Sequence, residues 1–281
     1  MSTSGPLIAA TAAPALAIAF WRNALATAVL APWAVVRHRQ ELRALDSRQW
    51  ALALAGGALL ALHFATWVPS LDYTSVASST ALVATQPAWA ALIARWRGQD
   101  VPGQAWVGIG VAFVGVLVIS GVDFALSPEA LFGDLLSLVG AFFAAAYVTV
   151  GAEARRTTST SVYTTLVYGT TSALLLVTCL VSGQALLGYS VDTWGKLVML
   201  TAGAQLLGHT VFNAVLKTTP PTVMSLALLF EMPGSALLAW VWLGQVPPWG
   251  VLPGAALLLA GIVLVVRSSR SGTAVSVPPL E

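Results

Sequence analysis

Residues 63–87 read HFATWVPSLDYTSVASSTALVATQP, and residues 209–233 read HTVFNAVLKTTPPTVMSLALLFEMP. At a shift of 146 residues, and without a gap, both stretches begin with histidine, carry Ala-Leu at 81–82 and 227–228 and end with proline. The same shift places further landmarks on each other: Trp96 on Trp242, Gly98-Gln99 on Gly244-Gln245, Pro102 on Pro248 and Gly115 on Gly261. The sequence therefore predicts two copies of one structural unit.

The composition indicates a membrane protein. Of the 281 residues, 57% are hydrophobic and 9% are charged, and the mean hydropathy is +0.82. Soluble domains carry about a quarter charged residues, and their surface helices need polar faces at helical period, which are missing over most of this chain. We expect a polytopic protein in a lipid bilayer, with no nucleic-acid partner. The single Cys179 excludes an internal disulfide and is expected to pack as a small hydrophobic residue.

Windows of about 20 apolar residues, the length that crosses a bilayer, predict nine membrane spans. They cover residues 14–36, 50–71, 74–95, 103–121, 133–152, 160–183, 195–216, 221–243 and 249–266. The apolar piece at residues 5–13 is too short to cross alone. The polar, Pro- and Ser-containing tail, residues 267–281, is predicted to be disordered.

The basic residues predict the orientation of these spans. Alternate connectors and the tail hold 11 of the 13 Lys and Arg residues. These are Arg37, Arg39, Arg43, Arg48, Arg95, Arg97, Arg155, Arg156, Lys217, Arg267 and Arg270. Because short cytoplasmic loops are enriched in Lys and Arg, we expect these connectors and the C-terminus to face the cytoplasm, in a cell (inner or plasma) membrane.

The repeat predicts an inverted topology. A unit of five spans is odd in number, so the second copy enters the membrane from the opposite side, and Arg95 and Arg97 become Val241 and Leu243 there. We therefore expect an all-α bundle of two inverted five-helix repeats, residues 1–121 and 133–266. The first helix would lack its opening residues, so we expect a start upstream of Met1; the alternative is nine spans preceded by a short stub. In such folds the substrate site lies near the midplane between the copies.

Four segments resemble the drug/metabolite transporter superfamily, EamA type. They are AIAFWRN (residues 18–23 together with Ala17), residues 63–87, GHTVFNAVL (208–216) and FEMPGSALLAWVWLGQ (230–245). The resemblance covers almost the whole chain and implies ten helices that move small metabolites through a central cavity by alternating access. Two departures stand out. Gly-Gln occurs at 98–99 and 244–245 where the family commonly has Gly-Glu, and Met232 separates Glu231 from Pro233.

Arg22 and Glu231 are the two charged residues well inside predicted spans. An ionisable group there costs roughly 2.5–3.5 kcal/mol unless it pairs or faces water. Arg22 lies about 13 Å along its helix at 1.5 Å per residue, which is deep for snorkelling. We expect Glu231 to bind a proton or a substrate ammonium and Arg22 to be its partner or a carboxylate anchor. A purely structural ion pair is the alternative.

His63 and His209 are equivalent in the repeat, which favours a shared place in the substrate or proton pathway. The alternative is a histidine bonded to a backbone carbonyl. Trp67, four residues after His63, either walls the cavity or belongs to the interfacial aromatic belt. Asn213 takes the equivalent place after His209 and can bond substrate or backbone. No metal-ligand spacing accompanies these residues.

Pro87 and Pro233 fall inside predicted spans, where proline breaks a backbone hydrogen bond and forms a hinge or a fixed kink. Small residues predict close helix packing instead. These are the stripe Ser75, Ser78 and Ser79, the pair Gly56-Gly57, and the set Gly108, Gly110 and Gly115. Asp72 is expected in a turn.

Together these features predict a secondary transporter, with export favoured, for small metabolites such as amino acids or drug-like cations. Proton coupling is left open. The sequence lacks HExxH and Gly-x-Ser-x-Gly motifs and an ATP-binding motif, so neither an enzyme nor a cofactor is expected. A membrane scaffold or receptor without transport is the other alternative. Whether two copies form a homodimer is also left open.

Overall fold

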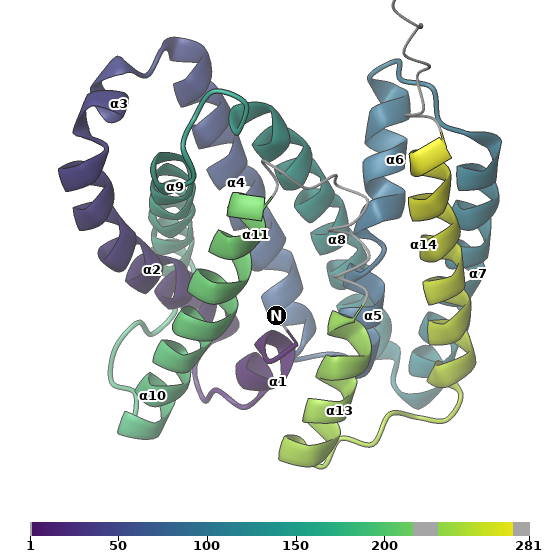
Figure 1. The fold of residues 1–281 in the computed structure, drawn as a ribbon. Helices are drawn as coiled ribbons and strands as arrows, with labels where there is room; N and C mark the ends of the chain where they lie inside the picture. The colour runs from purple at the N-terminus through teal and green to yellow at the C-terminus, as the bar shows by residue number, and fades with distance from the viewer. Residues whose placement is uncertain (1, 216–229, 272–281) are drawn as a thin grey trace, which may run out of the picture.

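The computed structural model describes residues 2–215 and 230–271, and its secondary structure there is helical (Figure 1). The elements are α1 (Ser4–Ala9), α2 (Ala15–Arg37), α3 (Arg39–Ala44), α4 (Ser47–Ser70), α5 (Val76–Val83), α6 (Gln86–Trp96), α7 (Gly103–Leu126), α8 (Pro128–Ala154), α9 (Thr160–Val181), α10 (Val191–Leu200), the π-helix η1 (Thr201–Thr210), α11 (Val211–Val215), α13 (Glu231–Leu243) and α14 (Val251–Ser271). In the described part, seven stretches are long and apolar enough to cross a membrane. The predicted all-α membrane fold is confirmed.

Polar residues fix where several helices begin. Asp46 forms a capping box at the start of α4: its carboxylate accepts from the Gln49 backbone N–H at 2.7 Å, and the Gln49 side chain accepts from the Asp46 N–H. Ser75, Ser159 and Ser190 cap α5, α9 and α10 in the same way, each hydroxyl accepting a backbone N–H. Short polar connectors thus end one span and start the next.

Three predicted boundaries were wrong. The span predicted at 103–121 continues to Leu126, and the one predicted at 133–152 begins at Pro128. The two helices meet in a tight turn at Ser127, so residues expected in a loop are helical. The tail predicted to be disordered from residue 267 stays in α14 as far as Ser271. Residues 272–281, and residues 221–229 at the start of the span predicted at 221–243, lie outside the described residues.

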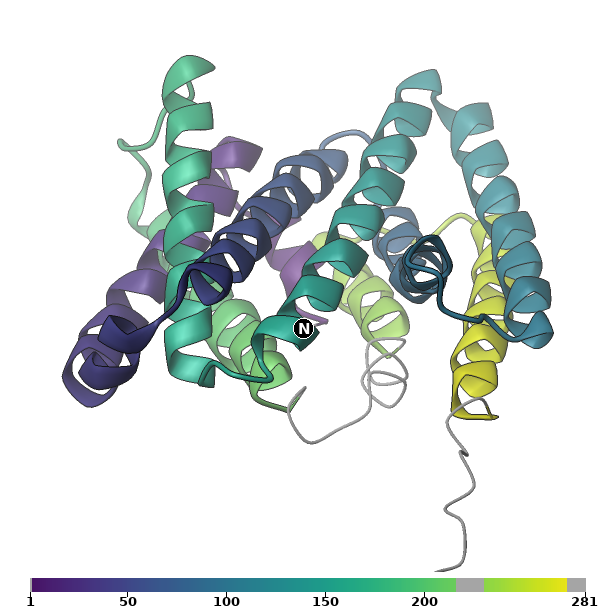
Figure 2. The ribbon, with the colours of Figure 1, turned by 90° about the horizontal axis from the view of Figure 1, so that it is seen from above.

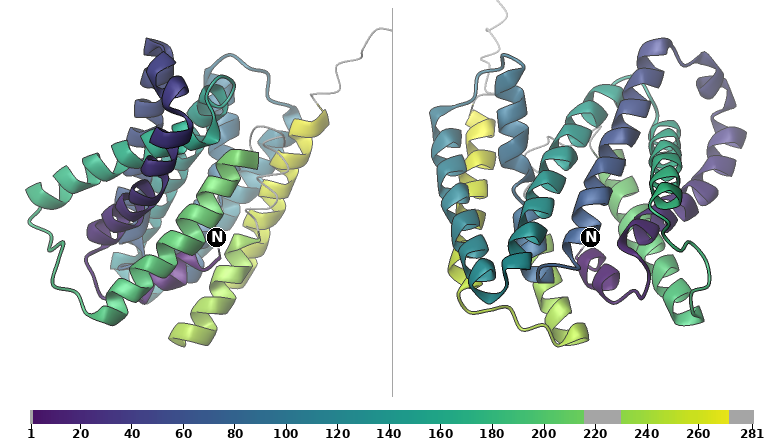
Figure 3. Two further views of the ribbon diagram at one scale, coloured as in Figure 1. Left: turned by 60° about the vertical axis from the view of Figure 1, so that its left-hand side comes forward. Right: turned by 180° about the vertical axis from the view of Figure 1, so that it is seen from behind.

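Helices related by the 146-residue shift pack against each other. α2 packs on α9, and α7 lies along α14, as the two views of Figure 3 show. Glycines make the second contact close, because a Cβ at Gly108 would lie 2.6 Å from the Gly261 carbonyl oxygen and one at Gly115 would lie 2.7 Å from that of Gly254. The shift maps Gly108 onto Gly254 and Gly115 onto Gly261, so the two contacts are exchanged by one twofold operation.

The other predicted close-packing residues divide in two. Gly56 and Gly57 bring α4 against α9, where an added Cβ would lie 2.7 Å from the Tyr163 hydroxyl and 2.5 Å from Thr170, respectively. Gly110, in contrast, faces open space, with no atom within 4 Å of an added Cβ. It lies on the wrong side of α7 to touch α14, so the prediction for this glycine was wrong.

The serine stripe packs as predicted. The Ser79 hydroxyl lies 2.9 Å from that of Ser70 on α4 and accepts from Ser137 on α8 at 3.1 Å. Ser75 caps α5 and bonds Ser78. These hydroxyls therefore join α4, α5 and α8, and Asp72 lies in the turn before them, as expected.

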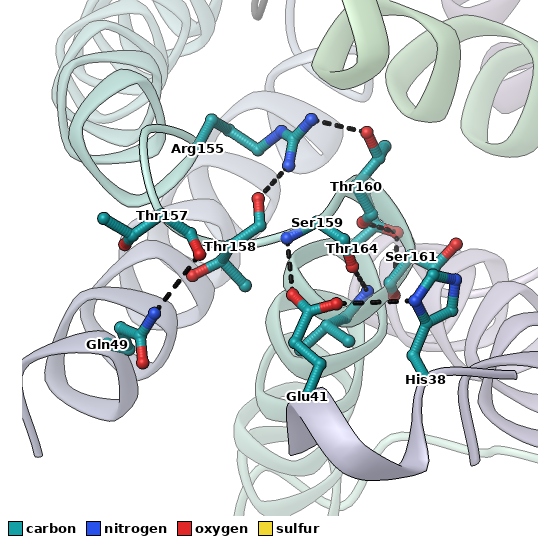
Figure 4. A network of polar contacts seen from close by, with 11 residues as sticks. His38, Glu41, Gln49, Arg155, Thr157, Thr158, Ser159, Thr160, Ser161 and Thr164 are labelled. Atoms are coloured by element: carbon teal, nitrogen blue, oxygen red, sulfur yellow. Dashed lines mark hydrogen bonds and ion pairs between the residues drawn. The ribbon is translucent and has the colours of Figure 1, made fainter. Parts of the chain in front are cut away.

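The arginine-rich connectors gather at one end of the bundle, the upper end in Figure 1, where α3, the end of α6 and the end of α14 lie. Figure 2 views the bundle from that end. Arg48 pairs with Glu153 at 2.7 Å, and Glu41 accepts from the Ser159 backbone N–H (Figure 4). Arg155 is 4% exposed and bonds Thr160 beside it. Burial lowers the pKa of its guanidinium, which Glu41 partly offsets.

Candidate functional site

A cavity of about 60 Å³ lies in the middle of the bundle, between helices of both repeats. Its wall comes from α1, α4, α5, α6, α8, η1, α11 and α13. The lining residues are Ser4, Leu60, His63, Trp67, Val83, Gln86, Ala144, Tyr147, Val148, Ala204, His209, Phe212 and Glu231. A water occupies roughly 30 Å³ of liquid, so this conformation has space for only a few waters.

His63 and Trp67 form one wall of the cavity. Their rings stack at a centroid distance of 5.6 Å and an interplanar angle of 14°. Nδ1 of His63 lies 2.9 Å from the Gly140 carbonyl oxygen, which can only accept, so Nδ1 carries the proton and Nε2 is the free nitrogen. Trp67 is 4% exposed, so it is not an interfacial belt residue. Its indole N–H has no hydrogen-bond partner.

Glu231 and His209 face the cavity from the second repeat. Glu231 begins α13 and is half-buried, and no described residue forms a hydrogen bond or an ion pair with its carboxylate. The His209 ring packs edge-on against Phe64 at 5.8 Å, and Phe64 also contacts the His63 ring at 4.9 Å. The repeat-equivalent histidines thus meet across one phenylalanine.

Arg22 lies behind the cavity wall and is fully buried. Its Nε donates to the Gln205 side-chain oxygen at 2.9 Å, one Nη donates to Ser4 at 3.3 Å, and the other Nη has no partner. The guanidinium lies 4.3 Å from the centre of the Phe64 ring, a cation–π geometry. Glu231 is close enough to interact with it electrostatically, but the two groups form no ion pair within 4 Å.

Asn213 is also fully buried, and its side chain forms hydrogen bonds within the helix bundle. Its amide bonds the Tyr147 hydroxyl, with distances of 2.8 and 3.1 Å, and donates to the His209 carbonyl oxygen at 2.8 Å. Tyr147 lines the cavity and Asn213 does not. Of the six predicted pathway residues, four line the cavity, and Arg22 and Asn213 lie just behind it.

The segment that presents Gln205 and His209 is a π-helix of ten residues. α10, η1 and α11 follow one another without a break (Figure 1), yet the equivalent part of the first repeat lies in the α-helix α4. π-helices are rare and occur mostly at functional sites. The wider turn changes which side chains face the cavity, so the two repeats differ here although their sequences align.

The predicted prolines lie at two helix starts beside the cavity. Pro87 is the second residue of α6, directly after a break between Val83 and Gln86, and it removes a backbone donor at this point. Pro233 is the third residue of α13. The residues before Phe230 lie outside the described part of the chain, so only the break at Pro87 is visible.

Several residues that line the cavity, and Gln205 behind its wall, were not predicted. Tyr147 stands in the Ala-rich run AFFAAAY, and Gln205 is an amide inside a predicted span, so their polarity was the available signal. Gln86 precedes the predicted Pro87 kink. Phe212 and Val83 look like ordinary lipid-span residues, and nothing in the sequence distinguishes them.

Comparison with known proteins agrees with this geometry. The model of the EamA-like transporter family matches residues 2–121 and 131–267.

The chain belongs to the EamA-like transporter family.

This EamA-like transporter is similar to curated proteins along most of its length. It is 24% identical over 254 residues to an uncharacterized transporter of Archaeoglobus fulgidus, covering 88% of this chain and 86% of the relative. It is 24% identical over 272 residues to a riboflavin transporter of Brucella anthropi, covering 94% and 91%. A solved crystal structure matches with a TM-score of 0.65 at 17% identity, covering 94% and 95% of the two chains, which shows a shared fold. The protein is therefore a membrane transporter with the inverted-repeat fold.

Proposed function

We propose that this transporter is a secondary carrier that exports small metabolites, amino acids or drug-like cations, by alternating access through the central cavity. The observation that carries the proposal is the Glu231 carboxylate, which no residue of the described part of the chain pairs with, in a cavity walled by stacked aromatic rings. A buried carboxylate without a protein partner is stabilised by a bound cation or a proton. Aromatic faces add cation–π attraction for an organic ammonium.

In this proposal the residues have distinct roles. Glu231 binds the substrate ammonium or, in its absence, a proton. Trp67 offers an aromatic face and an indole N–H that no described residue bonds, and His63, through its Nε2, and His209 accept or relay protons. Arg22 balances the carboxylate charge from behind the wall.

The size of the cavity supports a moving carrier. An amino acid does not fit in about 60 Å³, so the helices around the cavity must separate to admit a substrate. We propose that the helix starts at Pro87 and Pro233 act as the hinges. The moving units are the proposed repeats, residues 1–121 and 133–266, with the arginine-rich end in the cytoplasm of a cell membrane.

Flux into proteoliposomes tests the function. Purified protein would be assayed with amino acids, cationic dyes and riboflavin, each with and without an imposed pH gradient. Riboflavin is included because one relative is named a riboflavin transporter. Saturable uptake of a cationic or zwitterionic solute, accelerated by the gradient, is the expected result. Absence of flux for every solute in protein that is folded would favour a scaffold or receptor.

A further inference from the structure

Two carboxylates are buried far along the chain from Glu231, in the hairpin between α7 and α8. Asp123 is 3% exposed, near the end of α7, and Asp134 is 0% exposed, in the second turn of α8. The hairpin between α7 and α8 lies at the end of the bundle opposite the arginine-rich connectors (Figure 1). Neither acid was predicted to be buried, because one predicted span ended before Asp123 and Asp134 stood at the very start of the next.

Among the described residues, none forms a hydrogen bond of normal geometry with either carboxylate oxygen of Asp134. The Ser120 and Thr74 hydroxyls and the Asp123 carboxylate are close enough to interact with it. Asp123 accepts from Thr74 at 3.4 Å, so one hydroxyl lies between the two acids. A fully buried, unpartnered carboxylate beside a second carboxylate is costly when both are ionised.

No positive charge compensates these acids. The described Lys, Arg and His residues interact with neither carboxylate. From α5 and its preceding turn the neighbours are hydroxyls, and the other ionisable groups at this end, Asp72, Tyr73 and Glu129, are exposed.

α8 packs closely against the turn before α5 at the residue that precedes Asp134. At Gly133, next to Asp134, an added Cβ would lie 2.9 Å from the Tyr73 Cβ and 3.0 Å from the Ser70 carbonyl oxygen. α8 therefore lies flat on the turn between α4 and α5. A proton needs no volume, whereas sodium needs a shell of oxygen ligands.

We propose that Asp123 and Asp134 form a proton-binding site, in which the pair of acids holds one proton, with the Thr74 hydroxyl beside them, and ties α7, α8 and the start of α5 together. This site is separate from the central cavity and is proposed independently of any substrate. Loss of the proton places two charges in a dry contact, which loosens this end of the bundle. The pair thus makes the stability of this end depend on the pH of the compartment that it faces.

Infrared spectroscopy tests the proposal on the purified full-length protein. At neutral pH we expect a carboxylic-acid C=O band that shifts in D2O and is lost or reduced in both Asp134→Asn and Asp123→Asn. Glu129→Gln, which removes an exposed carboxyl from the same helix, is the matched control and should leave the band unchanged. A band that persists in both Asp variants would overturn the proposal.

Thermal unfolding against pH gives a second readout. At neutral pH the folded pair holds a proton that the unfolded chain does not hold. The free energy of unfolding should therefore fall as the pH rises. Asp134→Asn imitates the protonated form and should flatten this part of the curve while keeping the fold; Asp123→Asn should do the same. Unchanged pH dependence in both variants would contradict the proposal. The proposal would also be contradicted if sodium chloride, but not potassium chloride, stabilised the native protein and Asp134→Asn abolished this effect.

Discussion

At the scale of single residues, Glu231 is the group on which the proposed chemistry depends. Glu231→Gln removes the charge and keeps the shape, and because no described residue bonds the carboxylate, folding should be unaffected. We expect transport of a cationic substrate to fall at least about tenfold, the loss that roughly 1.4 kcal/mol of binding represents, and its response to a pH gradient to disappear.

The matched control is the exposed Glu129→Gln, which should transport normally. Flux measured between acid and alkaline pH separates the outcomes. If Glu231→Gln transports normally over this whole range, Glu231 does not couple transport to protons.

Arg22 gives a prediction about stability. Gln205→Leu removes the acceptor of its Nε and leaves a fully buried charge with one bond less. A hydrogen bond to a charged group contributes about 1.5–3 kcal/mol, so the midpoint of thermal unfolding in detergent should fall by several degrees. Gln205→Glu replaces the acceptor with a carboxylate and should retain stability. Equal loss in both variants would mean that Gln205 acts through packing alone.

The sequence could identify individual cavity residues only where symmetry or polarity marked them. His63 and His209 were found because the repeat aligns them, and Glu231 because it is charged inside a span. Asp123 was missed because the span predicted at 103–121 ended before it, and Asp134 because it stood at the very start of the span predicted at 133–152. Whether Trp67 faced lipid or the cavity depended on the packing of α8, which no local pattern contains.

At the scale of helices, the contact between α7 and α14 yields a prediction with an internal control. Gly108→Ala places a Cβ 2.6 Å from a backbone oxygen that has no room to move, so the helices must separate. Overpacking of this kind costs about 1–3 kcal/mol. Gly110→Ala adds the same methyl group to open space and should be neutral or slightly stabilising, because alanine favours helix.

Thermal unfolding of the two variants in one detergent decides between these expectations. Similar midpoints for Gly108→Ala and Gly110→Ala would show that the glycine contact does not hold α7 and α14 together. The sequence could not distinguish these two glycines, because they are only two residues apart in one glycine-rich run. They lie on different faces of α7, and only the position of α14 shows which of them is at a helix contact.

The π-helix η1 marks the limit of inference from symmetry. The repeat predicts that residues 201–210 match residues 55–64, which lie in an α-helix. The observed wider turn puts Gln205 against Arg22 and His209 on the cavity. The two copies therefore differ in structure here, although His63 and His209 both line the cavity.

At the scale of the molecule, the proposed transport requires a cavity that opens alternately to the two sides of the membrane. Its central position between the repeats follows from the topology that the sequence predicts, but its closed form does not. The chain offers a clean probe of this motion, because Cys179 is its single cysteine and is fully buried. Cys179→Ala therefore gives a background without thiols.

The most direct measurement places one cysteine in the cavity wall, as Ala144→Cys in that background, and labels it with a membrane-impermeant thiol reagent from either side. Ser47→Cys, at the arginine-rich end, and Gly110→Cys, in open space on α7, are the controls for sidedness and for a site outside the cavity. Alternating access predicts that Ala144→Cys reacts from both sides, and that a transported substrate slows its labelling. Labelling from one side only, unaffected by any substrate, would contradict the account.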